Sequence, residues 1–409
     1  MTAWDFDIVV AGAGPVALAF AAGMAGTGLR IALLDPQPEA VLADPPDDGR
    51  EIALTDRSVS SLDTLGAWSL IPPASVSPLR HMRVLNGASR YAMHFGGGAA
   101  PNPDGLLGRF VPNHALRRAL HRRARALPGV FILPGQSATA MQATRDGAIL
   151  VRNAGAPLRA GLVVAADTRR SRLRAQQRIG ALCHDYRQRM LVCPVTHERS
   201  HDDTATAWFE YGRTLVTLPM NNNRSSAVMT LPNDDADAML ALDDAAFGVE
   251  LTRRYRGRLG TMRPDGGRHA VPVFTAYASR FVGRRFALLG DAAVGMHPTT
   301  AHGFNFGLLG AAALATALRG ALEQGREVAD AGALSAFEAA HRAETRLFFG
   351  AAETLMRLYA GGEALPARLL RDGALRIGNL PPVRRMLEAR MREPDDAHAG
   401  RPGVGRSAV

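Results

Sequence analysis

Hydrophobic positions near the start of the chain form two short runs on either side of a segment of small residues. The first run, FDIVVA at residues 6–11, is apolar and rich in β-branched residues, which is typical of a buried parallel strand. The alanine-rich segment that ends near Gly28 predicts a helix, and LRIALLD after it predicts a second strand. A βαβ unit of about 30 residues is the length of a dinucleotide-binding motif.

Beyond a Pro/Asp-rich segment at residues 36–50, which is predicted to be a loop, the pattern changes. Apolar and polar residues alternate over 82–95 and again over 191–232, which predicts an antiparallel sheet inserted between pieces of the α/β lobe. The strand RRFALLG at 284–290 returns the chain to the nucleotide-binding lobe. From Gly303 to about Glu393 the pattern is helical.

Composition narrows the classes of function. The 409 residues carry a net charge of +10 and include no lysine, so the basic residues are arginines scattered along the chain. No basic motif is interleaved with aromatic residues, which argues against a nucleic-acid partner. Cys183 and Cys193 form no CxxC pair, so we expect no metal site and a reduced, cytoplasmic environment. The most apolar late stretch is interrupted by Arg319 and predicts a packed helix, not a membrane span.

A GxGxxA motif lies between the first strand and the helix. It consists of Gly12, Gly14 and Ala17, and Asp35 ends the second strand. Gly12 permits a tight turn, Gly14 lets the backbone approach a pyrophosphate, and Ala17 allows close packing of helix and strand. The helix N-terminus supplies N–H donors, and Asp35 is placed to accept hydrogen bonds from ribose hydroxyls. The motif predicts a dinucleotide site and leaves NAD and FAD both open.

An aspartate-bearing segment late in the chain, GDAAVGMHPTTAHGFNFG, favours FAD. Asp291 stands at the end of a strand, where a carboxylate can bind sugar-like hydroxyls, and a helix begins near Asn305. A helix N-terminus directed at a flavin stabilises the negative charge that appears on the reduced ring. An aspartate before a helix also commonly serves as a cap, so the prediction depends on the pairing with the N-terminal motif.

Together with AADTRRSRLR in the middle of the chain, these motifs resemble the three FAD-contacting segments of para-hydroxybenzoate-hydroxylase-type flavin monooxygenases. REIALTDRSVSSLDTLGAW and the late motif are similar to the ubiquinone-biosynthesis hydroxylases of that family, and TTAHGFN is most similar to those acting on demethoxyubiquinol-type rings. The resemblance implies that Arg50 lies near the flavin and the NAD(P)H path and that Asp291 holds the ribityl chain. It also implies that the isoalloxazine is lined by Pro298, Gly303 and Asn305.

The middle motif departs from the family pattern. Asp167, Ser171 and Arg174 match the fingerprint D-G-x-x-S-x-x-R, but Thr168 replaces its glycine. A β-branched residue would be strained there if the position needs a positive φ. Asp167 is therefore either a cofactor contact or a surface turn residue.

The late motif departs in two places. Val294 replaces a common histidine, and Ala301 and His302 replace the Gly-Gln that usually precedes Gly303. His302 either hydrogen-bonds the flavin edge or the substrate, with a pKa suited to proton exchange, or only fills the place of the glutamine. His297 presents the same two alternatives.

The fold class predicted is α/β, with a Rossmann-like FAD-binding lobe, an inserted antiparallel-sheet substrate lobe and C-terminal helices. The predicted boundaries are 1–80, 116–180 and 276–330 for the FAD-binding lobe, 81–115 and 181–275 for the substrate sheet, 331–393 for the helices and 394–409 for a disordered tail.

The resemblance implies an FAD-dependent monooxygenase that uses NAD(P)H and O₂ to hydroxylate a prenylated phenol or quinol ring. The catalytic candidates are Arg50, Pro298 and His302. A prenylated substrate resides in lipid, so we expect peripheral contact with the inner face of the membrane or work within a biosynthetic complex; the oligomeric state stays open. Two alternatives also stay open: hydroxylation of a small soluble aromatic compound, and a flavoprotein with little turnover that serves in a biosynthetic complex.

Overall fold

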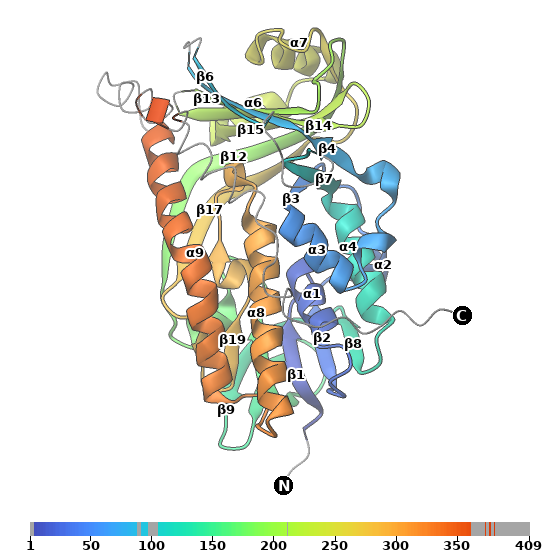
Figure 1. The fold of residues 1–409 in the computed structure, drawn as a ribbon, viewed down its shortest axis with the longest axis vertical. Coiled ribbons are helices and arrows are strands. Elements are labelled where there is room, and N and C mark those ends of the chain that lie inside the picture. The colour runs from blue at the N-terminus through green and yellow to red at the C-terminus, as the bar shows by residue number, and fades with distance from the viewer. Residues whose placement is uncertain are drawn as a thin grey trace.

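The computed structural model describes residues 4–87, 91–96, 105–210 and 212–360, together with 373, 376, 377 and 380. The predicted tail and the late helical segment after residue 360 lie largely outside them. An α/β lobe and a lobe built on a second, larger sheet are joined by two helices, α8 (Gly303–Glu323) and α9 (Ala331–Ala360), which lie side by side (Figure 1). The predicted fold class is confirmed.

The α/β lobe contains a sheet in which the strands at its centre run parallel. β1 pairs with β2 and β11, β2 pairs with β8, and β11 pairs with β19. The strands are β1 (Phe6–Ala11), β2 (Ile31–Asp35), β8 (Val130–Pro134), β9 (Ala138–Ala143), β10 (Ala148–Arg152), β11 (Leu158–Ala165), β18 (Val282–Gly283) and β19 (Phe286–Leu288). The apolar runs of β1, β2 and β11 are buried, as expected for parallel strands covered by helices.

The larger sheet is mostly antiparallel. Its strands are β5 (His81–Asn86), β6 (Ala92–Phe95), β12 (Ala181–His197), β13 (Thr204–Glu210), β14 (Arg213–Met220), β15 (Arg224–Pro232), β16 (Met262–Pro264), β17 (His269–Ala278) and β20 (Val294–Gly295). One pair differs from the prediction, because β5 and β13 run parallel. These two strands are far apart in the sequence and are not joined by a hairpin, so the antiparallel direction is not imposed on them.

A third, small sheet and the shorter helices complete the described residues. The sheet consists of β3 (Glu51–Leu54), β4 (Ser77–Leu79) and β7 (Gly108–Pro112). The helices are α1 (Pro15–Gly23), α2 (Glu39–Ala43), α3 (Asp56–Thr64), α4 (Asn113–Arg125), α5 (Arg172–Gln176), α6 (Asn233–Leu240) and α7 (Asp244–Arg254). The predicted loop at residues 36–50 thus contains a short helix, α2, because Leu42 is buried and the helix packs against α4.

Helix α8 is long and apolar enough to cross a membrane by length and composition alone. It is packed between α1 and α9, however, and small residues allow the approach. A Cβ on Gly307 would lie 2.5 Å from Val16 of α1, and one on Gly310 would lie 2.8 Å from the ring of His341 of α9. The close fit is that of a core helix, which is what the sequence predicts.

His341 is the most unfavourably placed titratable side chain of this interface. It is 2% exposed, and neither ring nitrogen has a hydrogen-bond partner among the described residues. Its ring packs against those of Phe337 and Phe281, with centroid distances of 5.9 and 5.4 Å. Burial lowers the pKa of His341 to about 4, so the folded protein holds the ring neutral at neutral pH.

Protonation of His341 therefore opposes folding as the pH falls. The unfolded chain takes up this proton near pH 6.5 and the folded chain only near pH 4, so stability is lost across that window. We expect the substitution His341→Leu to remove about 3 kcal/mol of acid destabilisation between those pH values. The free energy of unfolding is measured with urea at pH 7 and at pH 4.5. The control is His81→Leu, because His81 is exposed. An equal loss of stability in both variants and the parent would contradict the assignment.

Candidate active site

The glycine turn after β1 brings the first and middle motifs into contact. Gly12 has φ 109°, and a Cβ on it would lie 2.4 Å from the carbonyl oxygen of Ala166, directly before Asp167. Both the conformation and the close approach require glycine. Asp35 Oδ2 accepts a hydrogen bond from the Ala13 N–H at 2.9 Å, so the carboxylate predicted to bind ribose also holds the turn.

The N-terminus of α1 is built to receive an anion. Gly14 is its N-cap, no described side chain caps the helix, and Pro15 follows at the first helical position. The described residues place no atom within 4 Å of where a Cβ of Gly14 would stand, and Ala17 is buried against the sheet. Free N–H groups and open space above a helix N-terminus suit a pyrophosphate.

Two arginines tie the middle motif to the late motif. The buried Arg174 donates from Nη1 to the carbonyl of Ala292 at 2.8 Å and from Nη2 to the carbonyl of Arg169 at 2.7 Å. Arg169 in turn forms an ion pair with Asp291, with Nε 3.0 Å from Oδ2, and donates to the carbonyl of Phe274 at 2.8 Å. The Asp291 carboxylate is therefore held at the junction of the α/β lobe and the larger sheet.

The replacement of glycine by Thr168 causes no backbone strain. Thr168 is not among the residues with positive φ. Beside it, Asp167 is mostly buried and its Oδ1 has no hydrogen-bond partner within the described part of the chain. Burial raises the pKa of Asp167, and hydrogen bonds from Ser171 and nearby N–H groups oppose that change. Of the two alternatives for Asp167, a carboxylate oxygen without a partner next to Gly12 favours a contact to a polar cofactor over the role of a surface turn residue.

Asn305 anchors the start of α8. It is 6% exposed, and its amide donates to the carbonyls of Ala53 at 2.8 Å and Ala301 at 3.3 Å. Its oxygen accepts from the hydroxyl of Ser58 at 2.6 Å. The side chain predicted to line the isoalloxazine is thus engaged with β3 and α3, so any contact of Asn305 with the ring would come from its backbone.

The turn before α8 is strained at one position. Ala301 has φ 53°, in the place of the family's glycine, and a left-handed alanine costs roughly 1–2 kcal/mol. His302 follows as the N-cap, with Nδ1 against the carbonyl of Thr300 and its ring centroid 4.6 Å from that of Phe348. Burial lowers the pKa of His302. A carbonyl only accepts, so Nδ1 carries the proton and the neutral ring helps to hold the turn.

Arg50 lies in a different place from the late motif. Its guanidinium pairs with Asp48 at 2.6 Å and lines a cleft of about 380 Å³ with Met190, Val192 and Arg268. Glu51, the next residue, is largely buried, and this burial, together with the charge of Asp47, raises the pKa of its carboxyl to about 8. Neither of the other catalytic candidates, Pro298 and His302, lines this cleft.

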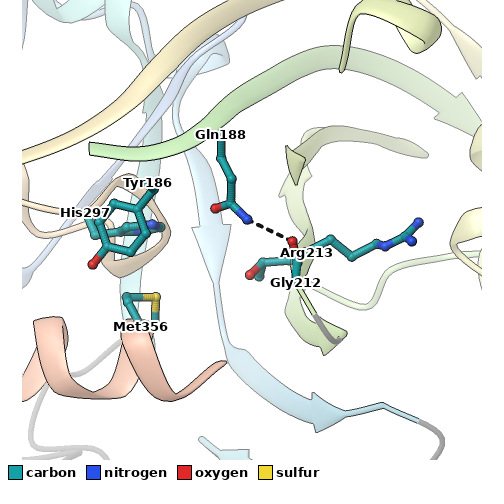
Figure 2. A pocket seen from close by; sticks show the side chains of 7 residues that line it. Tyr186, Gln188, Gly212, Arg213, His297 and Met356 are labelled. Carbon is teal, nitrogen blue, oxygen red and sulfur yellow. Dashed lines mark hydrogen bonds between the residues drawn. The ribbon is translucent and has the colours of Figure 1, made fainter. Parts of the chain in front are cut away.

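A second, small cavity lies where the late motif meets the larger sheet and α9 (Figure 2). It is lined by Tyr186, Gln188, Gly212, Arg213, Thr214, His297 and Met356. The rings of Tyr186 and His297 meet edge to face, with centroids 4.6 Å apart. Burial, together with the positive charge of Arg169 and the proximity of His184, lowers the pKa of His297 to about 4, so its imidazole is neutral at pH 7.

Sequence reasoning did not single out Tyr186, Met356 or Glu353, whose carboxylate accepts the Tyr186 hydroxyl at 3.1 Å. Tyr186 lies at an irregular point of β12, which the alternation of residues does not reveal. A signal was available for Glu353, because it shares the buried face of α9 with Phe349 and Met356. A carboxylate among apolar neighbours on a core-facing helix indicates a specific partner.

The candidate cofactor site consists of the glycine turn after β1, the carboxylates of Asp35, Asp167 and Asp291, and the N-termini of α1 and α8. The chain matches the family described as "FAD binding domain" over residues 5–344, and it belongs to that family. Within the family it belongs to the branch of FAD-dependent aromatic monooxygenases that contains the ubiquinone hydroxylases, whose usual reductant is NAD(P)H.

Two relatives support this placement, and one solved structure supports the fold. Ubiquinone hydroxylase UbiM of Neisseria meningitidis is 38% identical over 93% of this chain and 83% of its own, and ubiquinone hydroxylase UbiL of Rhodospirillum rubrum is 35% identical over 93% and 88%. The crystal structure of p-nitrophenol 4-monooxygenase PnpA from Pseudomonas putida has a TM-score of 0.74 at 18% identity, covering 94% of this chain and 96% of that one. The last similarity concerns the fold alone.

Gly14 of the first motif allows the FAD site to be tested. We expect Gly14→Ala to lower FAD affinity without lowering stability, because its methyl group would meet no protein atom but would occupy the open space above α1. Gly320→Ala, also in open space but on α8, is the matched control. Flavin titration by fluorescence and urea unfolding of the apoprotein separate the two properties. Unchanged FAD affinity in Gly14→Ala would contradict the placement of the pyrophosphate.

Proposed function

We propose that the protein hydroxylates a prenylated phenol or quinol ring in ubiquinone biosynthesis. The observation that carries this proposal is the shared cavity, because His297 of the flavin motif and Tyr186 of the larger sheet line the same space. A ring held there would lie between the flavin-binding turn and the sheet. The identity with two ubiquinone hydroxylases over 93% of the chain supports the substrate class.

The site residues have distinct roles in this proposal. The α1 N-terminus and Gly14 bind the pyrophosphate, Asp35 binds the adenosine ribose, and Asp291 binds the ribityl chain after exchanging its partner Arg169 for the hydroxyls. The flavin ring would contact the turn at Pro298, the backbone N–H groups of Gly303 and Asn305, and the side chain of His302. Arg50 lies on the path of NAD(P)H, and Asp167 contacts FAD with its free oxygen.

FAD supplies the redox chemistry, in which electrons from NAD(P)H activate O₂ for insertion into the ring. The protein positions the cofactor and the substrate and keeps water out of the site. The positive end of α8 would favour the negative charge of the reduced flavin, and His302, held neutral, leaves that stabilisation to the helix N-terminus. The sheet and α9 exclude water from the reacting oxygen, since water would divert it from the substrate.

The outer face of α9 supports contact with a membrane at the cytoplasmic side. This face is exposed and mostly apolar, with Ala336, Ala339, Ala340, Ala343, Leu347, Gly350, Ala351 and Leu355, and it also carries Glu344 and Thr354. Arg346 and Arg357 flank it, and arginines next to an apolar face favour anionic lipid. We take an anionic bilayer as the occupant, because a prenylated substrate is dissolved there. A partner protein of a biosynthetic complex is the alternative.

The reaction can be tested with the purified protein reconstituted with FAD. We expect oxidation of NADH or NADPH to be slow alone and faster with a prenylated phenol, with one oxygen atom of O₂ recovered in the product. Mass spectrometry of the product with labelled O₂ is the measurement. Stimulation by a small soluble phenol but not by a prenylated one would favour the soluble substrate instead. Flavin that stays oxidised with every phenol would favour a role in assembly without turnover.

Membrane contact can be tested separately on α9. Leu347 is 76% exposed, so Leu347→Glu should leave folding intact while weakening binding to vesicles of phosphatidylethanolamine and phosphatidylglycerol by about tenfold, from the lost burial of one leucine. Val249→Glu on α7, where the side chain is 71% exposed, is the matched control. Equal sedimentation of both variants with vesicles would exclude this face as the membrane contact and leave the complex as the alternative.

A further inference from the structure

One wall of the cavity beside His297 is formed by Tyr186, whose hydroxyl has no role yet in the proposed function. Tyr186 lies in β12 where the pairing with β17 shifts between Asp185 and Arg189, and Arg187 has φ 53° there. An irregularity of this kind re-aims a side chain. The Tyr186 hydroxyl is directed to α9, where it donates to Glu353 Oε1 at 3.1 Å. The bulge thus joins the sheet and the helix at the cavity.

Glu353 is arranged as a buried acceptor. The residue is 7% exposed, and Oε2 makes no hydrogen bond to any described residue, with the nearest charge an Arg357 nitrogen at 3.6 Å. A carboxylate accepts and does not donate, so the single proton of the Tyr186 hydroxyl is used in this bond. Burial, with the negative charge of Glu353, raises the pKa of Tyr186 and keeps that proton in place.

These contacts set the hydrogen-bonding character of the part of the cavity wall formed by Tyr186 and His297. With its proton donated to Glu353, the Tyr186 oxygen has only acceptor capacity left. His297 is neutral, and its Nδ1 accepts from the N–H of Thr299 at 3.3 Å, so its proton is on Nε2 and can be donated. The two side chains therefore offer one acceptor and one donor. A ring hydroxyl, which donates and accepts, can satisfy both, whereas an ether oxygen can satisfy only His297.

We propose that Tyr186 is a specificity-determining residue, positioned by Glu353, that selects a ring with a free hydroxyl over the same ring with a methyl ether. This inference rests on the proposed function, because it assumes that the substrate ring enters this cavity. The cavity measures about 10 Å³, far below the roughly 300 Å³ at which ligand pockets begin, so the ring enters as side chains move. Met356 of α9 lines the cavity, and its unbranched, flexible side chain can change rotamer to make room for the ring.

Binding without turnover tests the proposal. The FAD-loaded protein is titrated with 2-prenylphenol and with its methyl ether, in the absence of NAD(P)H, and the change in flavin absorbance is followed. We expect the phenol to bind about tenfold more tightly than the ether, because the ether leaves the Tyr186 oxygen without a partner. In Tyr186→Phe this preference should disappear. Glu353→Gln should reduce it, because the amide can donate to Tyr186 and release its proton toward the cavity.

Tyr277→Phe is the matched control. Its hydroxyl also bonds α9, at 3.1 Å from the Thr345 hydroxyl, but it does not line the cavity, so this variant should keep the preference. A preference that is equal in all variants, or lost equally in Tyr277→Phe, would overturn the role of Tyr186 and leave the proposed function intact. A flavin spectrum unchanged by both ligands, with NAD(P)H oxidation unstimulated by the phenol, would overturn the proposed function as well.

Discussion

The carbonyl oxygen of Ala166 stands where a side chain of Gly12 would be, 2.4 Å from the position of its Cβ. This contact joins the ends of β1 and β11, and with them the first and middle motifs. Any larger residue would separate the two strand ends, because backbone atoms on both sides cannot yield. The turn, the opening above α1 and the position of Asp167 all depend on this approach, so the candidate cofactor site is a consequence of packing at one glycine.

Two arginines, Arg169 and Arg174, hold separate segments of the chain together. Arg174 and Arg169 bind backbone carbonyls of three different segments, and the planar guanidinium suits this role because its donors are spread over three nitrogens in a fixed geometry. They fix the Asp291 segment against the middle motif and β17. The buried Arg174 finds its partners in carbonyls left free at strand and turn ends, so the cost of burying its charge is offset by well-formed hydrogen bonds.

Helix α9 links the fold to the chemistry. One face packs on α8, where His341 lies against Gly310. Farther along the helix Met356 lines the cavity beside Tyr186, and Glu353 accepts the Tyr186 hydroxyl. The opposite face is exposed and mostly apolar. The helix thus packs on α8, contributes to the wall of the cavity beside Tyr186, and presents the surface proposed for lipid contact.

The sequence by itself determined the βαβ unit, the three motifs, the inserted sheet and the packed character of α8, because local periodicity and glycine placement depend on neighbours in the chain. Tertiary structure alone decided the rest. Asn305 bonds Ser58 and Ala53, and Tyr186 meets His297 and Glu353; these contacts join residues up to 252 positions apart. The backbone conformation that accepts Thr168 without strain was likewise visible only in the structure. Such contacts depend on how lobes and helices pack, which a single sequence does not express in local pattern.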